Sequence, residues 1–130
     1  MSDALSAEQL RRKISAICLS LPEAQTAPRL SAHSKFSVAG RTFAYYLVDH
    51  HGDGRLALAC KAAPGAQAGL VAADPTRFFI PPYLGAKGWI GYDFGAARAD
   101  WREVRELITG SYCLVAPRRL AAAIGASAPE

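Results

Sequence analysis

The fold is decided by the stretch KFSVAGRTFAYYL, residues 35–47, in which apolar side chains alternate with polar or small ones on both sides of one glycine. Alternation with a period of two is typical of a strand with one buried face. Gly40-Arg41 suits a two-residue hairpin turn, because glycine adopts the positive φ that such turns require. The stretch therefore predicts two antiparallel strands.

A third strand follows the pair. The glycine-bounded turn at residues 50–54 leads into residues 55–61, where Leu56, Leu58 and Cys60 share one face. Three consecutive strands joined by short turns form an antiparallel meander. We expect its apolar face to be covered by helices.

The first helix is marked at both ends. Ser6 and Gln9 have the spacing of a capping box, and Leu10, Ile14 and Ile17 then recur on one face. Pro22 ends the helix, because the residue before a proline is forced out of helical geometry.

The second half predicts two helices and two strands. A short alanine-rich helix spans residues 65–73, and a strand at 77–80 is confined to a sheet edge by Pro81-Pro82. A strand at 89–94 and a helix from Asp100 to Pro117 follow. The order α-βββ-α-ββ-α predicts an α+β fold, in which helices pack on an antiparallel five-stranded sheet in two layers. Residues 1–130 form one domain in this interpretation, with a frayed tail from about residue 125.

Composition excludes several classes of protein. The chain is 51% hydrophobic and 20% charged, which is too apolar for a disordered chain. It has no apolar run near the ~20 residues that cross a bilayer. The start lacks a secretory pattern, and three widely separated cysteines indicate buried thiols in a reducing compartment rather than disulfides. We expect a cytoplasmic protein.

Basic residues are concentrated in the predicted meander. The net charge is +4, and residues 27–61 contain five Lys or Arg residues against two Asp residues. A local excess of positive charge favours binding to nucleic acid or another polyanion.

Three segments resemble the MmcQ/YjbR family. They are residues 21–44, with LPEA followed by HSKFSVAGRTFA; residues 74–91, DPTRFFIPPYLGAKGWIG; and residues 100–120, with DW followed by SYCLVAPRRL. The likeness covers about residues 10–120. One departure is Ser34, where the family pattern has proline after the histidine. The resemblance implies a fold like that of type III secretion chaperones, and DNA binding through a double-wing arrangement of hairpins. It supplies no catalytic residues.

One group of residues has the chemistry of a nucleic-acid surface, in which cations hold phosphates and aromatic rings stack on bases. The alternative is a solvated outer face whose charges protect the sheet edges. The candidate residues are Lys35, Arg41, Lys61, Arg77, Tyr83, Lys87 and Trp89.

The loop Gly85–Trp89 has two interpretations. Exposed backbone N–H groups beside Lys87 cradle a phosphate in one, although the full phosphate-loop motif is absent. In the other, the loop is a glycine turn with Trp89 in the core.

Other polar residues favour structural roles. His50, His51 and Asp53 lie in a turn and form a plain polar loop rather than a metal site. Ser111 is expected to bond the carbonyls of its own helix.

The predicted function is a non-enzymatic binding module for DNA or another polyanion, with no catalytic residue, no metal and no cofactor. One alternative is a protein-interaction module, chaperone-like or homodimeric, suggested by the secretion-chaperone resemblance. A second alternative is a small-molecule binder in a cleft near Tyr83 and Trp89.

Overall fold

The computed structural model describes residues 5–27, 32–49, 54–95 and 98–127. Its elements, in chain order, are α1 (Ala7–Leu19), β1 (Gln25–Thr26), β2 (Ser34–Val38), β3 (Arg41–Val48), β4 (Leu56–Lys61), α2 (Ala66–Ala73), β5 (Phe78–Phe79), the 3₁₀ turn η2 (Gly85–Lys87), β6 (Trp89–Asp93), α3 (Trp101–Val115) and α4 (Arg118–Ser127).

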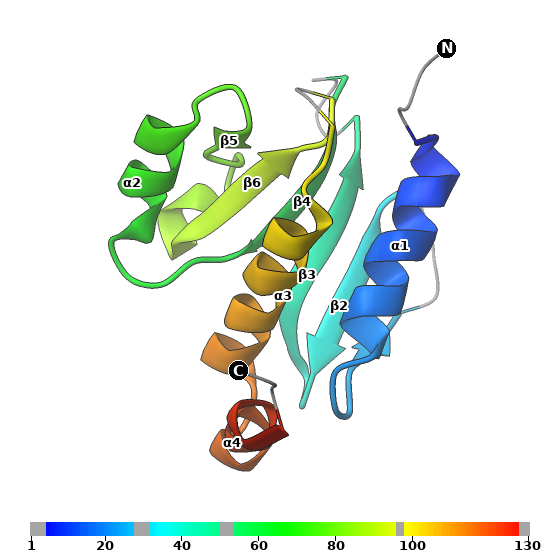
Figure 1. The fold of residues 1–130 in the computed structure, drawn as a ribbon, viewed down its shortest axis with the longest axis vertical. Helices are drawn as coiled ribbons and strands as arrows, with labels where there is room; N and C mark the ends of the chain where they lie inside the picture. The colour runs from blue at the N-terminus through cyan, green and yellow to red at the C-terminus, as the bar shows by residue number, and fades with distance from the viewer. Residues whose placement is uncertain (1–4, 28–31, 50–53, 96–97, 128–130) are drawn as a thin grey trace.

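The strands form one antiparallel sheet in the order β1-β2-β3-β4-β6-β5. Helices α1 and α3 lie side by side over one face of this sheet, and α2 lies at the edge formed by β5 and β6 (Figure 1). The sheet therefore has a helix-covered face and a second face, here called the outer face. The two-layer α+β prediction is confirmed.

The start of α1 is the predicted capping box. The Ser6 hydroxyl accepts from the Gln9 N–H at 3.1 Å, and the Gln9 side chain accepts from the Ser6 N–H at 2.8 Å. Asp100 caps α3 by accepting from the N–H groups of Arg102 and Glu103. Both helix starts were identified from residue spacing alone.

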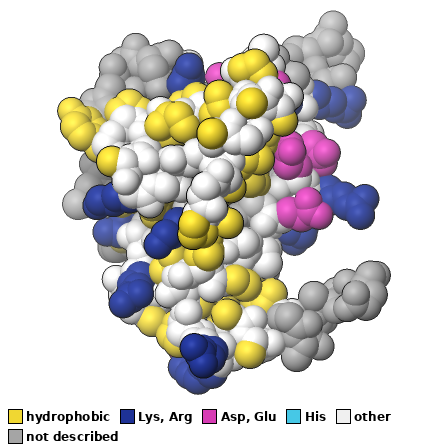
Figure 2. Space-filling model, turned by 90° about the vertical axis from the view of Figure 1, so that its left-hand side faces the viewer, with side chains coloured by type: hydrophobic (Ala, Val, Ile, Leu, Met, Phe, Trp, Pro, Cys, Tyr) yellow, Lys and Arg dark blue, Asp and Glu magenta, His cyan; other side chains and the backbone are white. Residues whose placement is uncertain are grey.

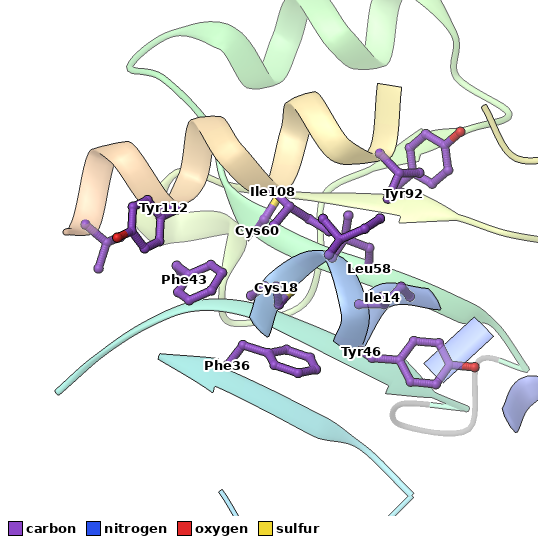
Figure 3. Close-up of a cluster of buried hydrophobic side chains, with 14 of the residues drawn as sticks. Ile14, Cys18, Phe36, Phe43, Tyr46, Leu58, Cys60, Tyr92, Ile108 and Tyr112 are labelled. Atoms are coloured by element: carbon purple, nitrogen blue, oxygen red, sulfur yellow. The ribbon is translucent and has the colours of Figure 1, made fainter. Parts of the chain in front are cut away.

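The main core fills the space between α1, α3 and the sheet (Figure 3). Ile14 from α1, Phe36 and Leu58 from the strands and Ile108 from α3 are fully buried there. Phe43 meets the edge of the Tyr112 ring at 5.5 Å between centroids. This face therefore carries most of the hydrophobic stabilisation.

Two elements are additions to the prediction. The two-residue strand β1 pairs with β2 as Gln25 opposite Ser37, which gives the sheet a sixth strand. The segment after Pro117 forms a separate helix, α4, whose Leu120 is buried in the core. A two-residue strand has too few side chains for a periodic signal, so its pairing is visible only in three dimensions.

The β2–β3 turn lies one residue earlier than predicted. Val38 pairs directly with Arg41, so the turn residues are Ala39 and Gly40, with φ of 51° and 78°. Two consecutive positive φ values are the signature of a type I′ turn, whose twist matches that of the strands it joins.

The expectation for Ser111 is wrong. Its hydroxyl donates to the Phe43 carbonyl at 2.6 Å and accepts from the Lys61 N–H at 2.9 Å. Ser111 is only 1% exposed and faces the sheet, so its hydroxyl satisfies two strand groups rather than its own helix. This one side chain joins α3 to β3 and β4.

Among the described residues, no helix is both long enough and apolar enough to cross a bilayer.

Candidate nucleic-acid interface

Strand register assigns two of the predicted lysines to the outer face. Lys35 lies opposite Tyr45, which in turn lies opposite Ala59. Lys61 lies opposite Trp89. Directly opposed residues of an antiparallel pair point to the same face, and these alternate with the core residues Phe36 and Cys60. Lys35 and Lys61 therefore share the face that the helices leave uncovered.

Lys87, in the loop before β6, lies close to the end of β4. The Ala62 N–H donates to the Gly88 carbonyl at 3.0 Å, which places the end of β4 beside this loop. Lys87 is the residue before Gly88 and is exposed. We call Lys35, Lys61 and Lys87 the lysine patch.

Figure 2 shows the same distribution of charge at the level of the surface. The helices lie toward the right of this view and the outer face toward the left. Lys and Arg side chains lie along the left side, at the bottom and on the right side of this view, whereas the visible acidic side chains lie at the top and on the right. Asp93, at the far end of the outer face, pairs with Arg55 at 3.6 Å. Cations therefore lie on both sides of the sheet, and in this view those along the outer face have few acidic side chains beside them.

Trp89 was predicted to be an exposed stacking ring of the patch, but its side chain is buried. It is 7% exposed and forms a second small cluster with Leu47 and Ala59. Tyr45 packs against it with ring centroids 5.7 Å apart. The indole is covered because it faces the loop that folds back over the start of β6, which agrees with the interpretation of Trp89 as a core residue.

The phosphate-cradle interpretation of this loop is wrong. The N–H groups of Gly85, Lys87, Gly88 and Trp89 donate to carbonyls within residues 81–85, at 2.8–3.3 Å. A cradle needs N–H groups that point at the ligand, and these point back into the turn. Lys87 can contribute its charge but not a nest of amides.

Gln67 holds the loop in place, a role that residue spacing did not reveal. Its side-chain amide donates to the Gly85 carbonyl at 2.8 Å and to the Trp89 carbonyl at 2.7 Å. Both hydrogens of one amide group are used, so α2 is tied to both ends of η2. A glutamine in an alanine-rich helix has no local feature that would predict a contact about 20 residues away in sequence.

Tyr83 is the exposed ring of this region. Its side chain is 79% exposed, while the neighbouring Leu84 packs against the Trp89 cluster. The prediction placed Tyr83 beside Lys87 on an accessible surface, and the structure has both on one loop at the outer face.

Arg77 does not belong to the patch. It is 6% exposed and lies over the Tyr92 ring, 4.6 Å from its centroid. Its guanidinium donates to the Asp93 carbonyl at 2.9 Å and to the Arg98 carbonyl at 2.7 Å. The prediction of a surface cation was wrong because this planar group with five donors bonds one carbonyl at the end of β6 and one in the connection to α3.

Arg41 lies on the other side of the sheet. It is exposed but pairs directly with Val38, a core residue that is 1% exposed. The register shift between Phe36 and Ser37 alters the alternation along β3. Arg41 therefore sits at the rim of the helix-covered face, and the hairpin tip does not extend the lysine patch.

The described side chains include no activated nucleophile among the cysteines. Burial raises the pKa of Cys60 to about 12 and raises the pKa of Cys18 and of Cys113 as well. A thiol must ionise to attack, so burial lowers the reactivity of these groups by favouring their protonated form. No group of three or more potential metal ligands occurs in the described part of the chain. His50, His51 and Asp53 lie outside it.

One shallow depression of about 460 Å³ lies away from the patch, between the turn before β1 and the β2–β3 turn. It is lined by Glu23, Ala24, Gln25, Ala39 and Gly40. The small-molecule alternative placed a cleft near Tyr83 and Trp89, where the indole and Leu84 instead pack together.

Comparison with known proteins gives a family and a structural neighbour. A family model described as YjbR matches residues 19–114. The crystal structure of the Deinococcus radiodurans protein DR2400, described as a DUF419 domain, superimposes with a TM-score of 0.65 and 24% sequence identity, covering 86% of this chain and 85% of that one. Among curated proteins, none matches this chain. The YjbR model covers most of the sequence and the DR2400 structure shares its fold, so the chain belongs to the YjbR family.

Proposed function

We propose that this protein is a non-enzymatic nucleic-acid-binding module that holds phosphates with the lysine patch on its outer face. The observation that supports this best is the convergence of Lys35, Lys61 and Lys87 from two strands and a loop onto the uncovered side of one sheet. A lysine ammonium is a compact charge on a flexible stem, which suits phosphate contacts without base recognition.

The spacing of the lysines favours a polyanion over a single phosphate. Lys35 and Lys61 are two strands apart and offset along them, so their Cα atoms are roughly 12 Å apart by ordinary sheet geometry. At that distance they contact different phosphates of one strand. Such a chain of phosphates is a property of nucleic acid.

The proposal assigns no catalytic step to the side chains described above. The carboxylates Asp93 and Asp100 are engaged, the first with Arg55 and the second in capping α3. The thiols are kept protonated by burial. A general acid or base needs a pKa near the working pH.

A fluorescence anisotropy titration with a labelled oligonucleotide at 50–300 mM salt tests the proposal. The wild type should bind at low salt and weaken as salt rises, because each phosphate contact releases counterions. The triple variant K35Q/K61Q/K87Q should lose most of the affinity and lower the salt slope by about 2.

The matched control is R102Q/R105Q/R118Q, which removes the same charge from α3 and α4, on the other side of the sheet. Its affinity should stay within about threefold of the wild type, since distant exposed charges are screened. Equal losses in both variants would show that net charge alone is responsible. No binding at 50 mM salt would overturn the proposal and favour a protein-interaction module, for which the exposed alanines of α2 (Ala68, Ala72, Ala73) offer a surface.

A further inference from the structure

The ring of Tyr83 is displayed on an unusual backbone. Its φ is 66°, in the left-handed region that non-glycine residues rarely adopt, and it is the most exposed large hydrophobic side chain that the structure describes. The Leu84 N–H donates to the Pro82 carbonyl at 2.7 Å, so Tyr83 is the central residue of a γ-turn with positive φ. Such a conformation persists only where the surroundings enforce it.

Residues on both sides enforce it here. Pro81 is under 2% exposed, and its carbonyl accepts from the Gly85 N–H at 2.8 Å. Leu84 is packed against Leu47, Ala59 and Trp89. The ring therefore points outward from a loop whose two ends are fixed in the protein.

Gln67 also fixes the loop that carries Tyr83. Its amide donates to the carbonyls of Gly85 and Trp89, which brace the loop from the side of α2. A ring held on a rigid loop loses little conformational entropy when a ligand binds to it.

The ring and the lysine patch together fit one class of ligand. Lys87 lies on the same loop, and the Ala62–Gly88 hydrogen bond brings Lys61 beside it. Bases inside a duplex have both faces covered by their neighbours, whereas an unpaired base can stack on an aromatic ring next to cations that hold its phosphates. Building on the proposed function, we infer that Tyr83 is a base-stacking platform and that the ligand is single-stranded nucleic acid.

The test compares a fluorescein-labelled single-stranded dT oligonucleotide with a labelled duplex of the same length, by anisotropy at 50 mM salt. The variant Tyr83→Asn removes the ring but tolerates the positive φ, so the loop can keep its shape. Tyr83→Phe keeps the ring. Leu114→Ala is the matched control, because Leu114 is 43% exposed but lies on α3.

The wild type should bind the single strand more tightly than the duplex. Tyr83→Asn should weaken single-strand binding about tenfold, while Tyr83→Phe and Leu114→Ala should stay within about twofold of the wild type. The lysine dependence of binding should persist in Tyr83→Asn. Circular dichroism should show the same secondary structure for all variants.

Two results would overturn the inference while leaving the proposed function intact. One is lysine-dependent binding that Tyr83→Asn does not weaken, and the other is duplex binding at least as tight as single-strand binding. The absence of salt-sensitive binding to either oligonucleotide would instead overturn the proposed function, and the inference with it.

Discussion

The two faces of the sheet use their polar groups in opposite ways. On the helix-covered face, the Tyr46 hydroxyl donates to the Ala7 carbonyl at 2.8 Å and the Tyr112 hydroxyl to the Pro22 carbonyl at 2.6 Å. The first hydroxyl joins β3 to the start of α1, and the second joins α3 to the turn after α1. On the outer face, lysines stand over a small cluster of Leu47, Ala59 and Trp89.

This difference separates folding from binding. A buried polar group has to be satisfied inside the protein, so the tyrosines and Ser111 are committed to the structure. A lysine on a thinly covered face needs no internal partner to be stable. The outer face can therefore carry a binding surface whose substitution leaves the core unchanged.

The largest effect should come from truncating one large apolar residue on each face. Ile108→Ala removes a fully buried side chain between α3 and the sheet, and should lower the free energy of unfolding by about 3–4 kcal/mol. Leu47→Ala, on the outer face, should cost about 2 kcal/mol, because the small cluster can relax toward solvent. Urea unfolding of the two variants measures the difference.

Equal costs would show that the outer face is a second core. In that case the separation of folding from binding would fail, and substitutions in the lysine patch would have to be checked for loss of stability as well as of affinity.

The next effect belongs to the helix-covered face alone and depends on pH. Burial raises the pKa of Cys18 and of Cys60 above the ordinary value of 9.0, to about 12 for Cys60. Above pH 9 the unfolded chain releases these protons while the folded protein keeps them. The stabilisation is therefore complete below pH 9 and is lost as pH rises toward 12.

Urea unfolding at pH 8 and pH 10 should show a loss of about 3 kcal/mol for the two thiols together. Cys60→Ala should reduce this loss by about half, whatever its effect on stability at pH 8. Cys113→Ala is the control, because Cys113 is only partly buried and should change the loss little. An unchanged pH dependence in Cys60→Ala would contradict the assignment to buried thiols.

The same contrast explains which parts of the molecule could be predicted from sequence. Helix starts depend on side chains three residues apart, and strands depend on alternation. The helix caps Ser6 and Asp100 and the strands within residues 35–47 could therefore be predicted from local sequence. Lys35, Tyr83 and Lys87 are exposed and Lys61 is half-buried, in keeping with the rule that long cations and turn tyrosines are rarely enclosed.

The failures at Arg77 and Ser111 involve contacts between distant segments, whereas those at Arg41 and the β2–β3 turn depend on local register. Arg77 is buried because the carbonyls of Asp93 and Arg98 happen to be within its reach, and Ser111 faces two strands that local sequence does not bring to it. Arg41 lies on the opposite face from the predicted one because of a single register shift in the sheet. A bulge of one residue reverses the side on which side chains point, and no composition rule identifies it.

The smallest predicted effect lies at the β2–β3 turn, away from both the core and the lysine patch. Ala39 has a φ of 51°, a conformation that costs alanine more than it costs asparagine, and Gly40 follows at 78°. Ala39→Asn should raise the free energy of unfolding by about 0.5–1 kcal/mol, because Asn-Gly is the preferred pair of a type I′ turn. Ala39 is exposed, so the larger side chain has room. Gly40→Ala, at the neighbouring position, should lower stability by about 1 kcal/mol because its φ is also positive. Thermal unfolding measures both changes, and oligonucleotide affinity should be the same in both variants. A change in affinity would mean that the hairpin tip takes part in binding after all, and the assignment of binding to the outer face alone would then be wrong.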